Sequence, residues 1–248
     1  MKRIHGDKVE IDEGAVGRFF ETRAAKYDDT NPAVSMLYQD SNPELAEQRD
    51  RNEKNVILPL LRLEETSRVL DVGCGVGRWA DALAGRVARY HGTDLMESLV
   101  CLARERHAGR ADITFQAMKA QDLTASALEC PPPFDLAIVA GVLHYINDRD
   151  CEAILRAVAN CCAGSKARLF IRGPVAADTR LTLQQVWSEE LQHEYSAIYR
   201  TVAELEELFA SALGEAWSPV SAGALLPQQL GNRKETFQYY HILESRFV

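Results

Sequence analysis

Residues 68–83, RVLDVGCGVGRWADAL, decide the fold of this chain. The stretch opens with a short apolar run that predicts a buried β-strand, and it closes with a pattern that predicts a helix. Between the two, glycines at positions 73, 75 and 77 alternate with other residues. Glycine lets a backbone turn sharply and brings its N–H groups against a ligand. The stretch therefore predicts a strand, a ligand-binding loop and a helix in succession.

The same alternation continues along the chain as far as residue 173. Strands are expected at 68–73, 87–95, 113–118, 134–143 and 167–173, with helices at 78–85, 96–109 and 149–164. The fourth strand is apolar on both alternating faces, which is typical of a strand covered on both sides. Alternating strands and helices predict an α/β fold with parallel pairing and right-handed crossovers, that is, a doubly wound sheet.

The two ends of the chain follow other patterns. Residues 1–66 read as helices and are expected to form a cover over the ligand site, with a second part at 67–248. An insertion is expected at about 174–200, with a helix near 181–191. Thr201 and Glu204 predict a capping box at the start of an amphipathic helix that ends at residue 214. The run 236–243 predicts an edge strand.

Composition and charge restrict the class of protein. The chain has 248 residues, 46% hydrophobic and 26% charged, which suits one large domain or one domain with an appendage. Its net charge of −8 argues against a nucleic-acid partner. Six irregularly spaced cysteines without a C-x-x-C pair predict neither a disulfide framework nor a metal site. We expect a cytoplasmic protein without a membrane partner, because neither a signal peptide nor a long apolar run is evident.

The glycine loop and the acidic residues near it distinguish between two classes of cofactor. Ligands of an open α/β sheet bind beyond the carboxyl ends of its strands, where Asp71 and Asp94 are both expected. Asp94 can accept hydrogen bonds from both hydroxyls of a ribose. The dinucleotide pattern G-x-G-x-x-G would need a glycine where Arg78 stands, and Asp71 suits a ligand amine better than a pyrophosphate. The loop therefore favours an adenosine that carries an amino acid.

Four motifs in order, VLDVGCGVG (69–77), HGTDL (91–95), KAQDL (119–123) and FDLAIVAGVLHYIND (134–148), extend this pattern. With them the chain resembles the class I S-adenosylmethionine-dependent methyltransferases from about Val69 to its end. The resemblance implies a Rossmann-like, mostly parallel seven-stranded sheet with an N-terminal helical cover and a substrate-side insertion after strand five. It also implies a cytoplasmic biosynthetic enzyme that uses S-adenosyl-L-methionine and releases S-adenosyl-L-homocysteine.

The resemblance further implies which residues bind the cofactor. They are Arg23, Tyr27, Asp71, Gly73, Gly75, Asp94, Leu95, Met96, Ala120, Gln121 and Ala140. Asp71 supports the ammonium group, Asp94 holds the ribose, and the residues at 95–96 and 120–121 surround the adenine. Arg23 and Tyr27 either close over the cofactor or belong to a solvated helix with one buried aromatic. Lys119 stands where members of the family often have an acid.

Methyl transfer from a sulfonium needs an acceptor held in line and shielded from water, with a base when the acceptor is a hydroxyl. His144 follows the fourth strand and is expected near the transferred methyl group. It either takes the acceptor's proton or packs and orients its loop. Tyr145 is expected in the same wall. His144 and Tyr145 are the catalytic candidates.

Arginines and aromatics after the fifth strand suggest the acceptor site. The candidates are Arg172, Tyr195, Tyr199, Arg200 and Tyr240. They either bind a polar, anionic small molecule or pack as core and lid. We expect a monomer or homodimer that methylates O or N of a sugar, glycan terminus or secondary metabolite. A methyltransferase for tRNA, rRNA or protein, and a non-catalytic cofactor-binding protein, remain the alternatives.

Overall fold

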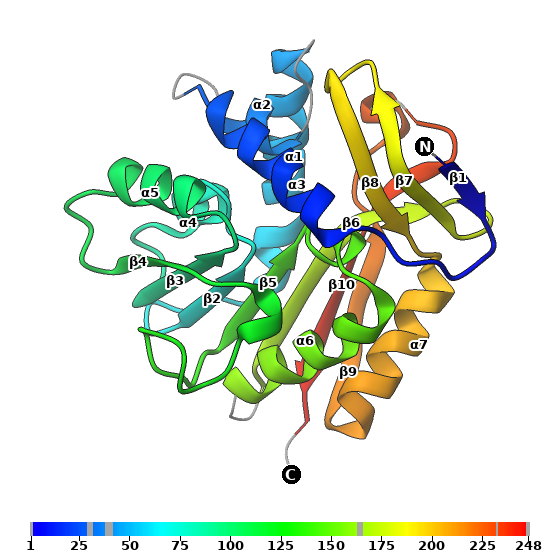
Figure 1. Cartoon of the computed structure of the whole chain (residues 1–248). Helices are drawn as coiled ribbons and strands as arrows, with labels where there is room; N and C mark the ends of the chain where they lie inside the picture. Colours follow the sequence, from blue (N-terminus) through cyan, green and yellow to red (C-terminus); the bar gives the residue numbers. More distant parts are fainter. Residues whose placement is uncertain (1, 29–31, 38–41, 163–165, 232, 247–248) are drawn as a thin grey trace.

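The computed structural model describes residues 2–28, 32–37, 42–162, 166–231 and 233–246. Its centre is a seven-stranded sheet in the order β4-β3-β2-β5-β6-β10-β9 (Figure 1). The strands are β2 (Arg68–Val72), β3 (Arg89–Asp94), β4 (Ile113–Ala117), β5 (Leu136–Ala140), β6 (Arg168–Ala176), β9 (Trp217–Ala224) and β10 (Thr236–Ser245). Neighbours from β4 to β6 pair in parallel, and β10 runs antiparallel to β6 and β9. The predicted doubly wound, mostly parallel sheet is confirmed.

Helices pack on both faces of this sheet and complete two apolar clusters. On one face, α6 (Asp148–Cys161) and α7 (Val202–Leu213) contribute Leu155 and Phe209 to the cluster around Leu70. On the other face lie α3 (Pro43–Leu61), α4 (Arg78–Leu83) and α5 (Glu97–Arg106), which belong to the second cluster. The predicted capping box at the start of α7 is present, because Thr201 and Glu204 bond to each other's backbone N–H groups.

A smaller, three-stranded sheet stands beside the main one. Its order is β1-β7-β8, built from β1 (Lys2–His5), β7 (Leu181–Ser188) and β8 (His193–Tyr199). The expected helix near 181–191 is therefore wrong, as is an all-helical N-terminus. Leu181 and Leu183 alternate with polar residues and point into an apolar cluster, which is the period of a strand. The pairing of β1 with β7 joins residues about 180 positions apart, which no local pattern reveals.

The edge of the main sheet also differs from the prediction. β10 is paired on both sides, so it is an inner strand, and β9 forms the edge. β9 is half exposed and contains Pro219, which an edge strand tolerates because one side of it needs no ladder hydrogen bonds. Its sequence lacks a continuous apolar run, and this explains why it was not predicted.

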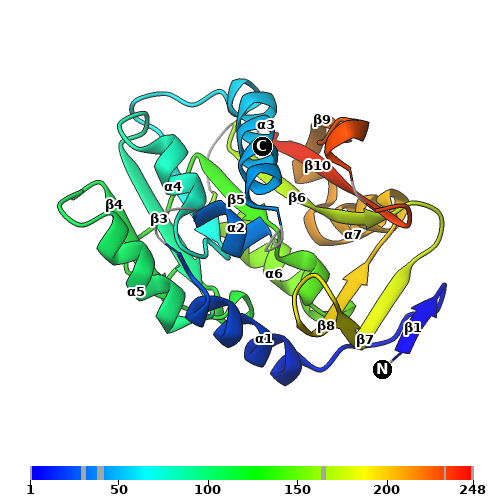
Figure 2. The same cartoon turned by 90° about the horizontal axis from the view of Figure 1, so that it is seen from above.

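The N-terminal helices α1 (Glu13–Ala25) and α2 (Pro32–Leu37) lie over the carboxyl ends of the central strands (Figures 1 and 2). Asp12 caps α1 by accepting a hydrogen bond from the N–H of Gly14 at 2.8 Å. Val16 and Phe19 of α1 pack against the smaller sheet. Across the described ranges of the chain, no helix combines the length and apolarity that a bilayer-spanning segment needs.

Candidate functional site

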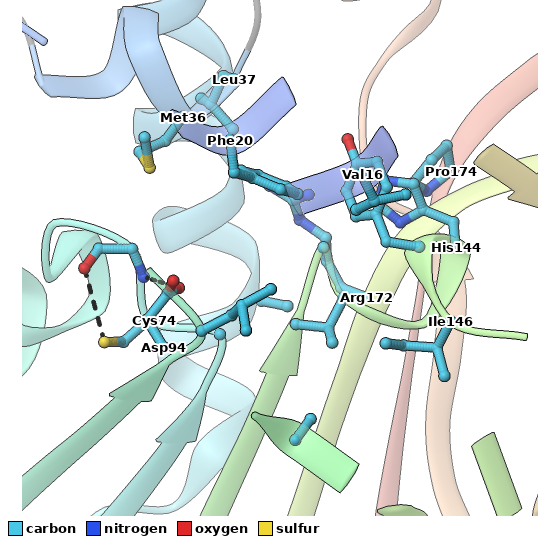
Figure 3. A pocket seen from close by; sticks show the side chains of 18 of the residues that line it. Val16, Phe20, Met36, Leu37, Cys74, Asp94, His144, Ile146, Arg172 and Pro174 are labelled. Atoms are coloured by element: carbon cyan, nitrogen blue, oxygen red, sulfur yellow. Dashed lines mark hydrogen bonds between the residues drawn. The ribbon is translucent and has the colours of Figure 1, made fainter. Parts of the chain in front are cut away.

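A cavity of about 1020 Å³ opens at the carboxyl ends of the central strands, beneath the N-terminal helices (Figure 3). The glycine loop after β2, the ends of β3, β5 and β6, and the segment before β10 all contribute to its lining. Small-molecule sites usually measure about 300–1,000 Å³. This cavity therefore has room for a cofactor and a second small molecule.

The glycine loop adopts a backbone that other residues rarely take. Gly73, Gly75 and Gly77 have φ angles of 77°, 55° and 82°. A Cβ atom on Gly73 would collide with Val142, and one on Gly75 would lie 2.6 Å from the Sδ atom of Met36. The backbone conformation therefore favours glycine at both positions, and at Gly73 the contact with Val142 also leaves no space for a Cβ. The loop presents its backbone to the cavity, as the sequence predicted.

Asp94 joins the glycine loop to the end of β3. Its Oδ2 accepts a hydrogen bond from the N–H of Gly75 at 2.8 Å, and its Oδ1 accepts one from the N–H of Met96 at 3.0 Å. Burial raises the pKa of this carboxyl, while the two backbone donors oppose the rise. Each carboxylate oxygen has a second acceptor site, so Asp94 can still accept hydrogen bonds from a ligand in the cavity.

Asp71 at the end of β2 is a buried carboxyl, and no basic side chain of the described residues hydrogen-bonds to it. The hydroxyl of Tyr90 donates to its Oδ2 at 2.5 Å. Burial raises the pKa of Asp71 to about 7, with Tyr90 and Arg78 acting in the opposite direction. Near neutral pH this carboxyl is therefore partly protonated and partly ionised. A ligand cation in the cavity would favour the ionised form.

The cavity collects most of the residues predicted to bind cofactor. Its lining includes Asp71, Gly73, Gly75, Asp94, Leu95, Met96, Ala120, Gln121 and Ala140. Leu95 has 43% of its surface exposed, so an apolar side chain stands at the mouth. Arg23 and Tyr27 lie outside the lining, and both interact with other parts of the protein. Their place in the cover is taken by residues that were not predicted, Phe20, Met36 and Leu37 (Figure 3).

His144 and Tyr145 lie in the short 3₁₀ turn η2 (Leu143–Tyr145) after β5, and both line the cavity. The ring centroids of His144 and Tyr145 are 3.9 Å apart, and the hydroxyls of Tyr145 and Tyr195 lie 2.9 Å from each other. Burial lowers the pKa of His144 to about 3, helped by the positive charges of Arg172 and Arg200. Its Nδ1 has no hydrogen-bond partner among the described residues. His144 is therefore a neutral imidazole with a buried Nδ1 that no described residue pairs with.

Glu53 of α3 is a buried acid that the sequence analysis missed. Its carboxylate accepts hydrogen bonds from Nε and Nη2 of Arg172 at 2.9 and 2.7 Å, and one from Nη2 of Arg78 at 3.1 Å. Burial alone would raise its pKa, but Arg172 and Arg78 lower it to about 2. A signal existed in the sequence: Glu53 stands on the stripe of α3 that also carries buried Ala46 and Ile57.

Residues 69–164 match a methyltransferase domain family. The chain carries a class I S-adenosylmethionine-dependent methyltransferase domain. Ubiquinone biosynthesis O-methyltransferase of Neisseria meningitidis serogroup C is 31% identical over 156 residues, 62% of this chain and 59% of that protein. Phosphoethanolamine N-methyltransferase 1 of Caenorhabditis elegans is 29% identical over 136 residues, 55% of this chain and 26% of that protein. The chain thus spans less than two thirds of the length of these curated relatives.

A solved structure extends the likeness of the methyltransferase domain to the whole fold. It is phosphoethanolamine N-methyltransferase 1 of Haemonchus contortus, in complex with phosphoethanolamine and S-adenosylhomocysteine. The two structures superpose with a TM-score of 0.69 at 19% identity, over 94% of this chain and 50% of that one. At this level of identity the likeness concerns the fold.

The methyltransferase domain and the rest of the chain share the cavity. The glycine loop, Asp94 and His144 fall within the matched segment 69–164. The residues predicted to bind the acceptor all lie beyond this segment. Among those, Arg172, Tyr195 and Tyr199 line the cavity. Tyr195 and Tyr199 belong to β8, which approaches the methyltransferase domain from the smaller sheet.

Two of the predicted acceptor residues lie outside the cavity lining. Arg200 donates to the carbonyls of Leu143 and Ile146 at 2.7 and 2.8 Å and to Asp148 at 2.7 Å, so it holds the turn that carries His144. Tyr240 packs in the cluster beneath the sheet, and its hydroxyl lies 3.1 Å from that of Ser221. Arginine at the end of a strand is typical of a ligand site and of a turn anchor alike, so its role depends on its tertiary contacts.

Proposed function

We propose that this chain transfers a methyl group from S-adenosyl-L-methionine to an oxygen or nitrogen atom of a small polar molecule. One observation carries the proposal: a single cavity joins the glycine loop, Asp71 and Asp94 to His144 and the tyrosines of β8. The match of residues 69–164 to a methyltransferase domain family supports it. We also propose that residues 1–66 act as the cover of this site, together with an acceptor-binding insertion at about 174–200.

The residues at the glycine loop fit this cofactor. Positive φ angles at Gly73 and Gly75 free the backbone for close approach, and Leu95 offers an apolar surface to an adenine. Asp94 can accept hydrogen bonds from the hydroxyls of a ribose. Asp71, in its ionised form, can hold an ammonium group. When bound, S-adenosylmethionine supplies the activated methyl group.

The chain's own contribution to the reaction is positioning and protection from water. Phe20, Met36 and Leu37 of the cover face the loop across the cavity, which limits the access of solvent (Figure 3). The neutral imidazole of His144 lines the cavity and can accept a hydrogen bond from the acceptor's O–H or N–H, which directs the acceptor's lone pair. Arg200 keeps this imidazole in place by holding the turn from behind.

A small acceptor is favoured over a macromolecule by the named relatives and by the charge of the chain. Phosphoethanolamine is a small molecule, and ubiquinone biosynthesis concerns small molecules too. The net charge of −8 does not suit an RNA substrate. The two relatives are named as an N- and an O-methyltransferase, so both acceptor atoms remain in the proposal.

Calorimetry followed by a transfer assay tests the proposal. The protein should bind S-adenosylmethionine and S-adenosylhomocysteine, and Asp94→Ala should weaken both because it removes the acceptor of the ribose hydroxyls. The Asp112→Ala variant, which removes a surface acid of the Arg110 ion pair, is the control. A panel of amines, phenols and sugar derivatives with labelled cofactor then identifies the acceptor. Absence of cofactor binding at millimolar concentration would overturn the proposal.

A further inference from the structure

Six basic side chains line the cavity, and besides Arg78 and Lys119 there are four that we call the cationic wall. They are Arg49 of α3, Arg172 of β6, and Arg233 and Lys234 from the segment before β10. These residues come from three distant parts of the chain, so only the fold brings them together.

The charges of the cationic wall are incompletely neutralised. Arg49 donates from Nε and Nη2 to the carbonyl of Leu230, at 2.9 and 2.6 Å, which is an uncharged partner. Arg172 is paired with Glu53. Within the described ranges, Arg233 and Lys234 form neither a hydrogen bond nor an ion pair. Within the described ranges, the wall therefore holds more positive charge than its acidic partners compensate, even with Glu190 acting on Arg49.

The carboxylates in the cavity lining belong to other places. Asp71 and Asp94 lie at the glycine loop, while Glu13 and Glu21 lie on α1. Over the described part of the chain, no ion pair joins any of these four to the cationic wall.

Arg49 lies close enough to Arg172 and Arg233 for their positive charges to act on it. The pKa of Arg49 is lowered by burial and then by the charges of Arg233 and Arg172, against a smaller opposing effect of Glu190. Repulsion of this kind shows that the guanidinium groups share one electrostatic environment. An anion between them would relieve it. The planar guanidinium group forms paired hydrogen bonds with carboxylates and phosphates, so these are the anions that suit the wall.

The wall adjoins the proposed methyl-transfer position. Arg172 and His144 line the same cavity, and Arg172 is close enough to lower the pKa of the imidazole (Figure 3). Tyr195 and Tyr199 supply aromatic surface to the same cavity. A molecule anchored by its anion at the wall would extend its remaining atoms toward the imidazole of His144.

We propose that the acceptor carries a carboxylate or phosphate group and that the cationic wall binds this group while His144 faces the atom to be methylated. The proposal rests on the methyltransferase activity proposed above and specifies its substrate class. Inorganic phosphate and citrate are the probes, because each offers one of the two anion types without the rest of an acceptor.

Binding of the two probes is measured by calorimetry at constant ionic strength, with and without S-adenosylhomocysteine. We expect the wild-type protein to bind one of them, and Arg49→Gln/Arg233→Gln to weaken that binding about tenfold or more through loss of charge-assisted hydrogen bonds. The control is Arg149→Gln, which removes an equally charged but exposed side chain outside the cavity lining. This control should bind the probe as the wild type does.

A preference for phosphate or for citrate identifies which anion the acceptor carries. Equal binding by the wild type and the double variant, or no binding of either probe, would overturn the inference.

The transfer assay then separates the two proposals with matched acceptors that differ only in the anionic group. Methylation of the neutral members alone would reject the anionic acceptor while leaving the methyltransferase proposal intact. Failure to bind cofactor would reject the methyltransferase proposal, whereas the probe titrations without cofactor still test the wall.

Discussion

At the scale of single residues, we expect Asp71 to make cofactor binding sensitive to pH. Its pKa of about 7 is well above the ordinary value, so below pH 7 the folded protein holds a neutral carboxyl at this position. A ligand ammonium group favours the ionised form, and binding below pH 7 must therefore release a proton. We expect the affinity for S-adenosylhomocysteine to fall about tenfold between pH 8 and pH 6. Calorimetry at a series of pH values measures this.

Asp71→Asn provides the comparison for that pH series. The variant keeps an acceptor for the Tyr90 hydroxyl but has no proton to lose, so its affinity should be lower and nearly independent of pH. A variant with the full wild-type pH dependence would assign the effect to another group.

His144 offers a second prediction at this scale. His144→Ala should lower kcat about 10²-fold or more, because the hydrogen-bond acceptor for the substrate is lost. Cofactor affinity and its pH dependence should be unchanged, since neither resides in this side chain. With a pKa of about 3, the imidazole contributes no step to the rate between pH 5 and pH 8. A variant of normal rate would show that His144 only packs against Tyr145.

At the scale of elements, a glycine of the loop and a glycine elsewhere distinguish two effects of an added side chain: a steric contact in the cavity and backbone strain. Gly75→Ala must place a Cβ 2.6 Å from the Sδ of Met36, in addition to adopting a positive φ of 55°. Gly109 has a φ of 85° with open space around it, so Gly109→Ala carries the backbone strain alone. We expect both variants to lose about 1–2 kcal/mol of unfolding free energy from the positive φ. Only Gly75→Ala should also lose affinity for S-adenosylhomocysteine.

Chemical denaturation and calorimetry on the two glycine variants distinguish these effects. Equal loss of affinity in both would mean that strain, and not the approach of the ligand to the loop, limits binding. The comparison works because the two glycines share a left-handed backbone and differ in their surroundings.

At the scale of the whole molecule, Glu53 ties the cover to the sheet. It is 1% exposed and bonds Arg172 of β6 and Arg78 of α4 at once. Glu53→Gln leaves two buried arginines with less compensation, and we expect the free energy of unfolding to fall by about 3–5 kcal/mol. Urea denaturation measures the change. Asp112→Asn breaks a partly exposed ion pair with Arg110 and should cost no more than about 1 kcal/mol.

The contrast between those two variants has a clear alternative outcome. If Glu53→Gln were as stable as Asp112→Asn, the cover would be held by its apolar contacts, such as Ile57 and Leu61 in the cluster beneath the sheet. The ion pairs of Glu53 would then serve only to position the arginines.

The sequence by itself determined the parallel sheet, the glycine loop and the residues at its edge. Alternating apolar runs and helices are local patterns, and parallel strands bring their carboxyl ends to one side, so Asp71, Asp94 and His144 converge without further information. The capping box of α7 was equally legible, because it spans only Thr201 to Glu204.

The tertiary structure alone decided which partners these residues have. Arg172 reads as a ligand residue in the sequence, yet Glu53, more than a hundred positions away, takes two of its nitrogens. Arg200 points behind the turn instead of into the cavity, and Leu181–Ser188 form a strand because β1 and β8 pair with them. Buried charge pairs and antiparallel pairing join residues distant in the chain. Local patterns do not record these contacts, and for that reason the sequence named Arg172, Tyr195 and Tyr199 as cavity residues but not the partners that hold Arg172 and Arg200.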